Sequence, residues 1–154
     1  MTTGVTTSAE TAMDAQDIAR GCADAMWEND HASQALGMEI VSVAPGTATL
    51  TMRVRKDMLN GLGTCHGGFM FALADSAFAF ACNTHNQFTV AQHCAITYHA
   101  PPGEGAMLIA TATEVHRAGR SGLYDIAVTG EDGKLYATFR GHSRTVPGTH
   151  LAAT

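Results

Sequence analysis

The feature that most constrains the fold of this chain is an apolar stretch from Gly68 to Cys82, in which Asp75 is the single charged residue. Leucine, methionine, alanine and phenylalanine fill nearly every position and proline is absent. This composition predicts a helix that is apolar on all sides and therefore buried. The stretch is short for a membrane span, and a central aspartate would be costly in a bilayer. We therefore predict a fold in which a sheet encloses this helix.

The central carboxylate needs an explanation of its own. Burial removes its hydration, so Asp75 is costly unless it is paired, hydrogen-bonded or open to a cavity. It is either a hydrogen-bonded structural residue or a functional group whose pKa is altered by burial. The sequence leaves both interpretations open.

Composition limits the partners and the cellular location. The 154 residues suffice for one domain with a substantial core. A formal net charge of -5 gives no basic excess to neutralise phosphates, so we expect no nucleic-acid partner, and no membrane partner either. The four cysteines lack a CxxC spacing, and the N-terminus lacks the basic and apolar segments of a signal peptide. These features predict a reduced, cytoplasmic setting.

The predicted elements are a helix, two strands, the buried helix and four further strands. An amphipathic helix is expected over residues 14–36, ending at Gly37. Strands are expected at residues 38–43, 47–54, 88–99, 106–116, 123–129 and 134–146, with turn or loop signals between them. We expect one domain over residues 13–146, between a disordered segment at 1–12 and a flexible segment at 147–154.

This α+β arrangement, an antiparallel sheet wrapped around one long buried helix with an extra N-terminal helix, is the hotdog fold. Three short motifs also carry a family resemblance: Asn60-Gly61, Cys65-His66-Gly67-Gly68 and Leu73-Ala74-Asp75. With further matches over residues 24–146, the chain resembles the phenylacetate-degradation (PaaI-type) acyl-CoA thioesterases. The resemblance implies hydrolysis of an aryl-acetyl-CoA thioester, phenylacetyl- or hydroxyphenylacetyl-CoA, to the free acid and coenzyme A.

Thioester hydrolysis requires stabilisation of the charge that builds on the carbonyl oxygen. Backbone N–H groups at the start of a buried helix can supply it, and glycine permits the close approach, so His66-Gly67-Gly68 is a candidate oxyanion site. The resemblance implies the Gly67 N–H as the donor, with Gly68 beside the substrate. Asp75 then acts as general base or as nucleophile, and the sequence does not separate the two roles.

Asn60 and His66 each have two interpretations. The resemblance implies that Asn60 orients the water or the thioester, whereas an asparagine in a loop is also typical of a structural cap. His66 acts either in proton transfer or by bracing the loop. We favour bracing, because only Asp75 lies where a desolvated base is expected.

Further substrate contacts are expected from several side chains. Met58, Phe69 and Phe78 suit an aryl or medium acyl group, although such residues also fill ordinary cores. The strand that faces the site has no serine or threonine at residues 90–93, so Ser76 or Gln92 is the candidate for a second polar side chain that assists Asp75. Arginines in the last two hairpins are candidate contacts for the phosphates of coenzyme A: Arg117, Arg120, Arg140 and Arg144.

The spacing of Gly67 and Asp75 bears on assembly. Along a helix they stand about 12 Å apart, so one chain does not easily bring both to the same carbonyl. The resemblance implies a homodimer that shares its active sites, with the carboxylate from the partner chain, and dimers paired into a homotetramer. The strand at residues 88–99 is the expected open edge at which chains pair.

Other functions remain as alternatives. A Cys65 nucleophile is disfavoured, because Cys65 and His66 are neighbours on an extended loop and no third group orients the histidine. No HxH, HExxH or CxxC spacing occurs, so neither a metal nor another cofactor is expected. A hotdog enoyl-thioester hydratase or dehydratase would pair a catalytic histidine with an acid, whereas the helix of this chain carries Asp75 without a histidine partner. A non-catalytic acyl-CoA-binding protein would not need the intact set of Asn60, Gly67 and Asp75.

Overall fold

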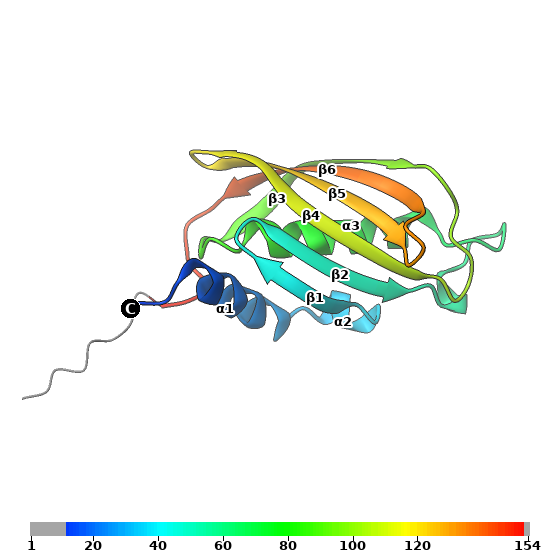
Figure 1. Cartoon of the computed structure of the whole chain (residues 1–154), viewed down its shortest axis with the longest axis horizontal. Coiled ribbons are helices and arrows are strands. Elements are labelled where there is room, and N and C mark those ends of the chain that lie inside the picture. Colours follow the sequence, from blue (N-terminus) through cyan, green and yellow to red (C-terminus); the bar gives the residue numbers. More distant parts are fainter. Residues whose placement is uncertain (1–11, 153–154) are drawn as a thin grey trace, which may run out of the picture.

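The computed structural model describes residues 12–152 and contains a six-stranded antiparallel sheet curved around one long helix (Figure 1). The elements in chain order are α1 Ala15–Trp27, α2 His31–Ala35, β1 Glu39–Ala44, β2 Thr47–Arg53, the 3-10 helix η1 Lys56–Met58, α3 Gly67–Cys82, β3 Thr89–Tyr98, β4 Met107–Ala118, β5 Ser121–Gly130 and β6 Leu135–Thr145. All lie within the range predicted for the domain, residues 13–146. Most of the segment predicted to be disordered, residues 1–11, lies outside the described residues, as do residues 153 and 154.

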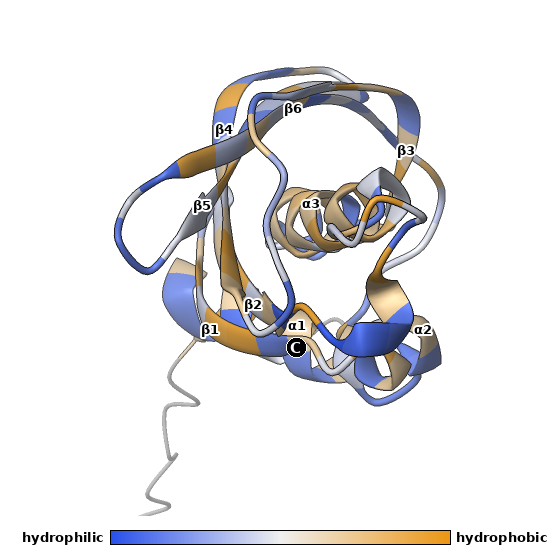
Figure 2. Cartoon of the chain, turned by 90° about the vertical axis from the view of Figure 1, so that its right-hand side faces the viewer, coloured by the Kyte–Doolittle hydropathy of each residue, from blue (hydrophilic) through white to orange (hydrophobic). Residues whose placement is uncertain are grey.

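The strand order is β1-β2-β4-β5-β6-β3, so β1 and β3 are the edges of the sheet. Figure 2 looks along α3, which lies inside the curve of the sheet. The predicted hotdog architecture is confirmed, and so is the edge position of the strand that follows the buried helix. No helix within residues 12–152 is both long and apolar enough to cross a membrane.

The core forms between α3 and the inner face of the sheet. Small residues on α3 let the strands approach closely, while larger side chains fill the space between them: Leu73, Phe78 and Phe80 on α3, and Leu50, Met52, Leu108, Ile126, Val128 and Phe139 on the strands. Each such side chain contributes about 1.5–3 kcal/mol when fully buried. At Gly141 of β6 a Cβ would lie 2.8 Å from the Phe78 ring, so this packing requires glycine.

One stripe of α3 is only partly buried. It runs from Gly68, which is exposed, through Ala72, Asp75, Ser76 and Ala79. The prediction of a helix buried on all sides is therefore wrong for this stripe. The physical reason is that the sheet does not close, since its edge strands β1 and β3 do not pair with each other.

The helix predicted over residues 14–36 is two helices. Asp14 caps α1 by accepting a hydrogen bond from the Asp17 N–H at 2.8 Å. Asp30 caps α2 by accepting one from the Ser33 N–H at 3.0 Å. Aspartate at an N-cap favours a new helix start, so the amphipathic pattern continues through residues 28–30 although the helix does not.

A β-bulge interrupts β3 at Gln92. Ala91 stands opposite Ser143 of β6, whereas His93 stands opposite His142, so Gln92 has no partner residue. The extra residue shifts the alternation of side chains along the strand. As a result Cys94 and Tyr98 face α3, while His93 points to the outer face of the sheet.

Residues after Pro147 make contacts that the prediction of a flexible segment at 147–154 did not anticipate. The Asn86 Oδ1 accepts hydrogen bonds from the N–H groups of His150 and Leu151, at 3.0 and 2.9 Å. The His150 Nε2 lies 2.7 Å from the Asn83 Oδ1, and its ring packs edge-on against Phe88. Residues 148–151 thus lie against the turn between α3 and β3.

Candidate active site

The loop before α3 is held by backbone hydrogen bonds. The His66 N–H donates to the Met58 carbonyl at 2.8 Å, and the Cys65 N–H donates to the Pro102 carbonyl at 2.9 Å. A bridge between Leu59 and Cys65 closes the loop at its base. These contacts fix where α3 begins.

His66 caps α3 with its ring. The Nδ1 accepts a hydrogen bond from the Gly68 N–H at 3.0 Å, and the His66 carbonyl accepts one from the Phe69 N–H at 3.0 Å. The ring therefore carries its proton on Nε2. This is the contact that the bracing interpretation requires. It leaves the Gly67 N–H without an acceptor among residues 12–152.

Gly67 lies against Tyr98 of β3. The Tyr98 hydroxyl donates to the Gly67 carbonyl at 2.9 Å, and a Cβ on Gly67 would lie 2.8 Å from the Tyr98 ring. Both residues line a hollow of about 410 Å³ with Asn60, Thr64, Cys65, Met70, His99, Ala100 and Pro101. A free N–H at the positive end of a helix, open to a hollow, is a site for a developing oxyanion.

Asn60 uses one end of its side chain to hold the loop. Its Oδ1 accepts hydrogen bonds from the Leu62 N–H at 2.9 Å, the Thr64 N–H at 3.2 Å and the Thr64 hydroxyl at 3.3 Å. The amide N–H groups of Asn60 have no partner in the described part of the chain, and the residue lines the same hollow as Gly67. The oxygen serves as a loop cap and the nitrogen remains a donor, so both interpretations of Asn60 are compatible with this geometry.

Asp75 is a half-buried carboxylate that pairs with no cation. None of the ion pairs formed by residues 12–152 includes it. The Cys94 Sγ lies 4.0 Å from its Oδ1. Burial raises the pKa of Asp75, and burial together with the charge of Asp75 raises the pKa of the Cys94 thiol to about 11. A desolvated carboxylate of this kind is a stronger base than an exposed one.

Within one chain the two halves of the predicted site stay apart. Asp75 does not line the hollow at Gly67 and lies two helical turns away, about 12 Å at the rise of a helix. Strand β3 runs beside α3, with Tyr98 at Gly67 and Cys94 at Asp75. The structure brings Asn60, His66 and Gly67 together and leaves Asp75 separate.

Three other predicted residues have partners inside the chain. The Ser76 hydroxyl lies 2.8 Å from the Ser33 hydroxyl of α2. The Met58 side chain is fully buried in the core, and the Gly68 N–H is bound by His66. None of the three lines the hollow at Gly67.

The predicted arginines do not gather at the start of α3. Arg140 forms a bidentate pair with Asp125 on the outer face of the sheet, at 2.6 and 2.7 Å, which holds the pKa of Asp125 below its usual value. The Arg120 Nε donates to the Thr145 carbonyl, and Arg144 is exposed. The structure thus gives no common phosphate site for Arg120, Arg140 and Arg144 within one chain.

The Cys65 thiol is poorly placed for nucleophilic attack. It is buried and lies 3.6 Å from the His66 carbonyl, and burial raises its pKa. The Nδ1 of His66 is already bound to the Gly68 N–H. As for metals, no three His, Cys, Asp or Glu side chains of residues 12–152 come together as ligands.

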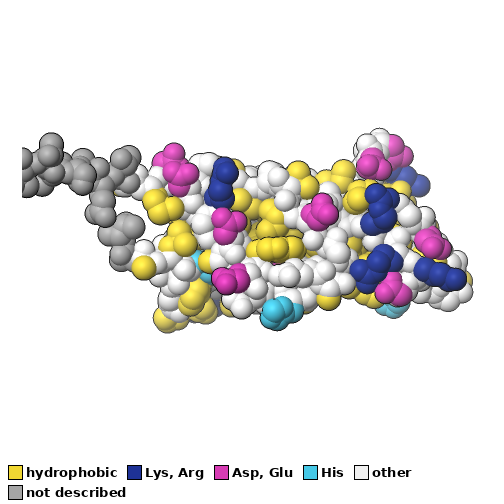
Figure 3. Space-filling model, turned by 90° about the horizontal axis from the view of Figure 1, so that it is seen from below, with side chains coloured by type: hydrophobic (Ala, Val, Ile, Leu, Met, Phe, Trp, Pro, Cys, Tyr) yellow, Lys and Arg dark blue, Asp and Glu magenta, His cyan; other side chains and the backbone are white. Residues whose placement is uncertain are grey.

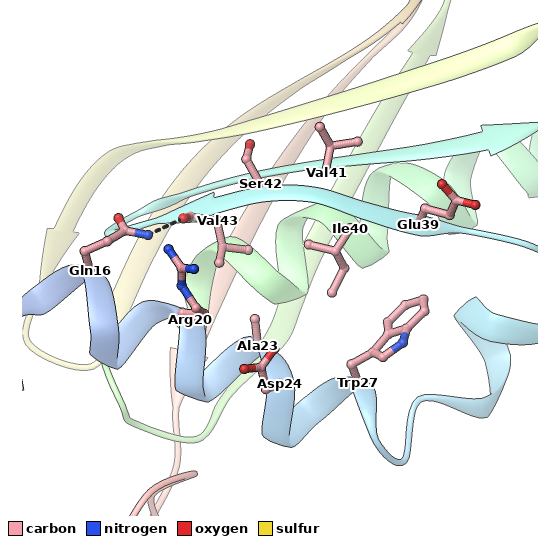
Figure 4. A pocket seen from close by; sticks show the side chains of 10 residues that line it. All are labelled: Gln16, Arg20, Ala23, Asp24, Trp27, Glu39, Ile40, Val41, Ser42 and Val43. Atoms are coloured by element: carbon pink, nitrogen blue, oxygen red, sulfur yellow. Dashed lines mark hydrogen bonds between the residues drawn. The ribbon is translucent and has the colours of Figure 1, made fainter.

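A further hollow, of about 670 Å³, lies between α1 and β1 (Figure 4). Arg20, Asp24 and Trp27 line it, and the Gln16 amide donates to the Val43 carbonyl at its end. On the face seen from below, acidic and basic side chains are interspersed with apolar ones (Figure 3). None of the predicted site residues lines this hollow.

The chain is similar to known thioesterases. Residues 62–137 match the family described as Thioesterase superfamily. The acyl-coenzyme A thioesterase PaaI of Escherichia coli is 45% identical over 127 residues, which cover 82% of this chain and 91% of the relative. A structure of E. coli PaaI has a TM-score of 0.87 at 43% identity, covering 88% of this chain and 99% of that one. A structure of a mutant PaaI from Thermus thermophilus has a TM-score of 0.73 at 44% identity, covering 76% of this chain and 100% of that one. On this evidence of sequence and fold, the chain belongs to the thioesterase superfamily.

Proposed function

We propose that the protein is an acyl-CoA thioesterase that hydrolyses aryl-acetyl-CoA thioesters, phenylacetyl- or hydroxyphenylacetyl-CoA, in phenylacetate degradation. The observation that carries the proposal is the free Gly67 N–H at the start of α3, on the same helix as the desolvated Asp75 carboxylate. The 45% identical relative from E. coli is named an acyl-coenzyme A thioesterase, which supports this choice.

The groups suit a two-part mechanism. The Gly67 N–H binds the thioester oxygen and stabilises the charge that develops there. Asp75 takes a proton from a water molecule as the water oxygen bonds to the carbonyl carbon. The carbon–sulfur bond then breaks, and the departing coenzyme A thiolate takes up the proton. In the alternative route Asp75 itself attacks, and water hydrolyses the resulting mixed anhydride.

A second copy of the chain would complete each site. Strand β3 is an edge with unpaired backbone groups, which favours pairing with another strand. Cys94 and Tyr98 lie equally far from Ile96 on the inner face. An antiparallel pair of β3 strands centred on Ile96 would therefore place Tyr98 and Gly67 of one copy beside Cys94 and Asp75 of the other. The partly exposed stripe of α3 beside this edge is consistent with such a homodimer.

The larger assembly and the location are also part of the proposal. Two dimers would pair into a homotetramer through the outer face of the sheet. There a hollow of about 590 Å³ is lined by small side chains, Thr111, Thr113, Ala127 and Thr138, beside the ion pair of Asp125 and Arg140. A cytoplasmic setting is supported by the four cysteines, all of which are free. Sedimentation analysis of the pure protein tests the assembly.

The function is tested by measuring thiol release from a panel of aryl- and alkyl-CoA esters. We expect turnover, with the highest kcat/KM for aryl-acetyl esters. The same protein is incubated with an enoyl-CoA, and the loss of the conjugated double bond is followed. Hydration of the enoyl-CoA without thiol release would instead identify the protein as a hydratase. Saturable acyl-CoA binding without turnover would identify it as a non-catalytic binding protein.

Two substitutions separate the structural role of Asn60 from its proposed catalytic role. Asn60→Asp keeps an acceptor oxygen for Leu62 and Thr64 but removes the amide donor. We expect turnover to fall by about one to three decades while the unfolding midpoint stays near that of the wild type, as for loss of one positioned donor. Asn60→Ala removes both groups and should lower turnover and the midpoint together. If Asn60→Asp is fully active, the amide has no part in the reaction.

Cys65→Ala tests the thiol alternative. The buried thiol touches a backbone carbonyl and no base, so we expect kcat/KM within about threefold of wild type. Cys22→Ala, at a buried cysteine of α1, serves as the matched control for loss of a core thiol. Complete inactivity of Cys65→Ala alone would reinstate Cys65 as nucleophile.

A further inference from the structure

The peptide unit between Gly67 and Gly68 is bound at both of its ends. Its N–H, from Gly68, donates to the Nδ1 of His66, and its C=O, from Gly67, accepts from the Tyr98 hydroxyl at 2.9 Å. The two side chains approach from different elements, one from the loop before α3 and one from β3. The chemistry described above uses the Gly67 N–H but assigns Tyr98 no part.

This double contact compensates for the composition of the helix start. Two consecutive glycines leave the backbone freer than any other pair, so the direction of the Gly67 N–H is not fixed by local conformation alone. Fixing the next peptide unit at both ends restricts the rotation about the Cα of Gly67. The Tyr98 ring adds to this, because it packs where a Cβ of Gly67 would stand.

The position of Tyr98 depends on the bulge in β3. With Gln92 unpaired, Tyr98 stands opposite Ala137, whose side chain is buried on the inner face of β6. If Gln92 were instead paired with His142 in regular alternation from Ala91, each later residue would change face and Tyr98 would turn outward. Bulges are common next to active sites, where they redirect a side chain.

We propose that Tyr98 is a positioning residue for the oxyanion donor. Its hydroxyl and the His66 ring hold the peptide between Gly67 and Gly68, and the held peptide keeps the Gly67 N–H pointing into the hollow that both Gly67 and Tyr98 line. This role rests on the proposed thioesterase activity for its catalytic consequence, while the hydrogen bond itself does not depend on it.

Tyr98→Phe tests the role, because it keeps the ring and removes the donor. We expect kcat to fall by about tenfold with KM within about twofold, since loss of an oxyanion donor itself costs 10²- to 10³-fold and here its orientation alone is loosened. Amide hydrogen exchange at residues 67–70 should become faster. Tyr136→Phe, at a tyrosine of β6 whose ring packs beside Gly130, is the control and should leave both measurements unchanged.

The outcomes separate the positioning role from the proposed function. Unchanged exchange at residues 67–70 overturns the positioning role, whether or not kcat falls, and a fall in kcat would then assign Tyr98 to direct contact with the substrate. A change confined to KM also overturns it. If the wild type hydrolyses no thioester, the proposed function fails. Faster amide exchange in Tyr98→Phe would still show that the Tyr98 hydroxyl restrains the start of α3.

Discussion

Asp75→Asn is expected to abolish thioester hydrolysis while the protein still folds and binds acyl-CoA. The substitution keeps the shape of the side chain and removes its ability to take a proton or to attack. Loss of a general base lowers turnover by about 10²- to 10⁴-fold, and loss of a nucleophile by at least as much. The measurement is thiol release together with acyl-CoA binding by calorimetry. Activity within a few-fold of wild type would remove Asp75 from the mechanism.

The same substitution should stabilise the fold at neutral pH. Burial raises the pKa of Asp75 in the folded state, so the ionised carboxylate favours the unfolded state above that pKa. This cost disappears as the pH falls through the raised folded-state value toward the unfolded-state value. We therefore expect Asp75→Asn to unfold at a higher temperature than wild type at pH 7, and the difference to shrink on acidification.

A matched substitution on the outer face gives the opposite sign. Arg140 lowers the pKa of Asp125, so this pair stabilises the fold above the unfolded-state pKa, and the contribution is lost as the pH falls through the folded-state value. Asp125→Asn should therefore lower the unfolding midpoint slightly at pH 7, because exposed pairs contribute little. Equal shifts for Asp75→Asn and Asp125→Asn would show that burial does not set the behaviour of Asp75.

Much of the fold could be predicted because hydrophobic periodicity reports which face of an element is buried. The apolar run from Gly68 to Cys82 indicated the central helix, and the alternation in residues 106–146 gave the last three strands within a few residues of their observed bounds. Two features escaped this reasoning. The helix break at Asp30 depends on a cap within a continuous amphipathic pattern, and the bulge at Gln92 depends on pairing with β6.

The sequence supports an argument about the residue types of the candidate site but not about their contacts. The glycines and Asp75 follow from what an oxyanion and a base require. The acceptor role of the His66 Nδ1 and the loop contacts of the Asn60 Oδ1 are set by loop geometry, which residue spacing does not specify. Tyr98 was missed as a site residue because only the strand register turns it toward Gly67.

Two inactive variants are expected to restore each other in mixed dimers. Asp75→Asn lacks the base, and Gly67→Val forces either the Tyr98 ring or the helix start to move, since even a Cβ at residue 67 would lie 2.8 Å from that ring. In a hybrid dimer that shares its sites, one site combines the intact Gly67 of one chain with the intact Asp75 of the other. The second site contains both lesions and stays inactive.

The expected recovery follows from chain statistics. After free exchange about half of the dimers are hybrids, each with one of two sites intact, so the mixture should regain roughly a quarter of the wild-type activity per chain. Mixing Asp75→Asn with Asp75→Ala is the control and should recover nothing, because no combination contains the carboxylate. Exchange is verified by native mass spectrometry. If hybrids form and remain inactive, Gly67 and Asp75 act within one chain. The separation of about 12 Å that helical rise gives them along α3 must then close by a movement of the helix start.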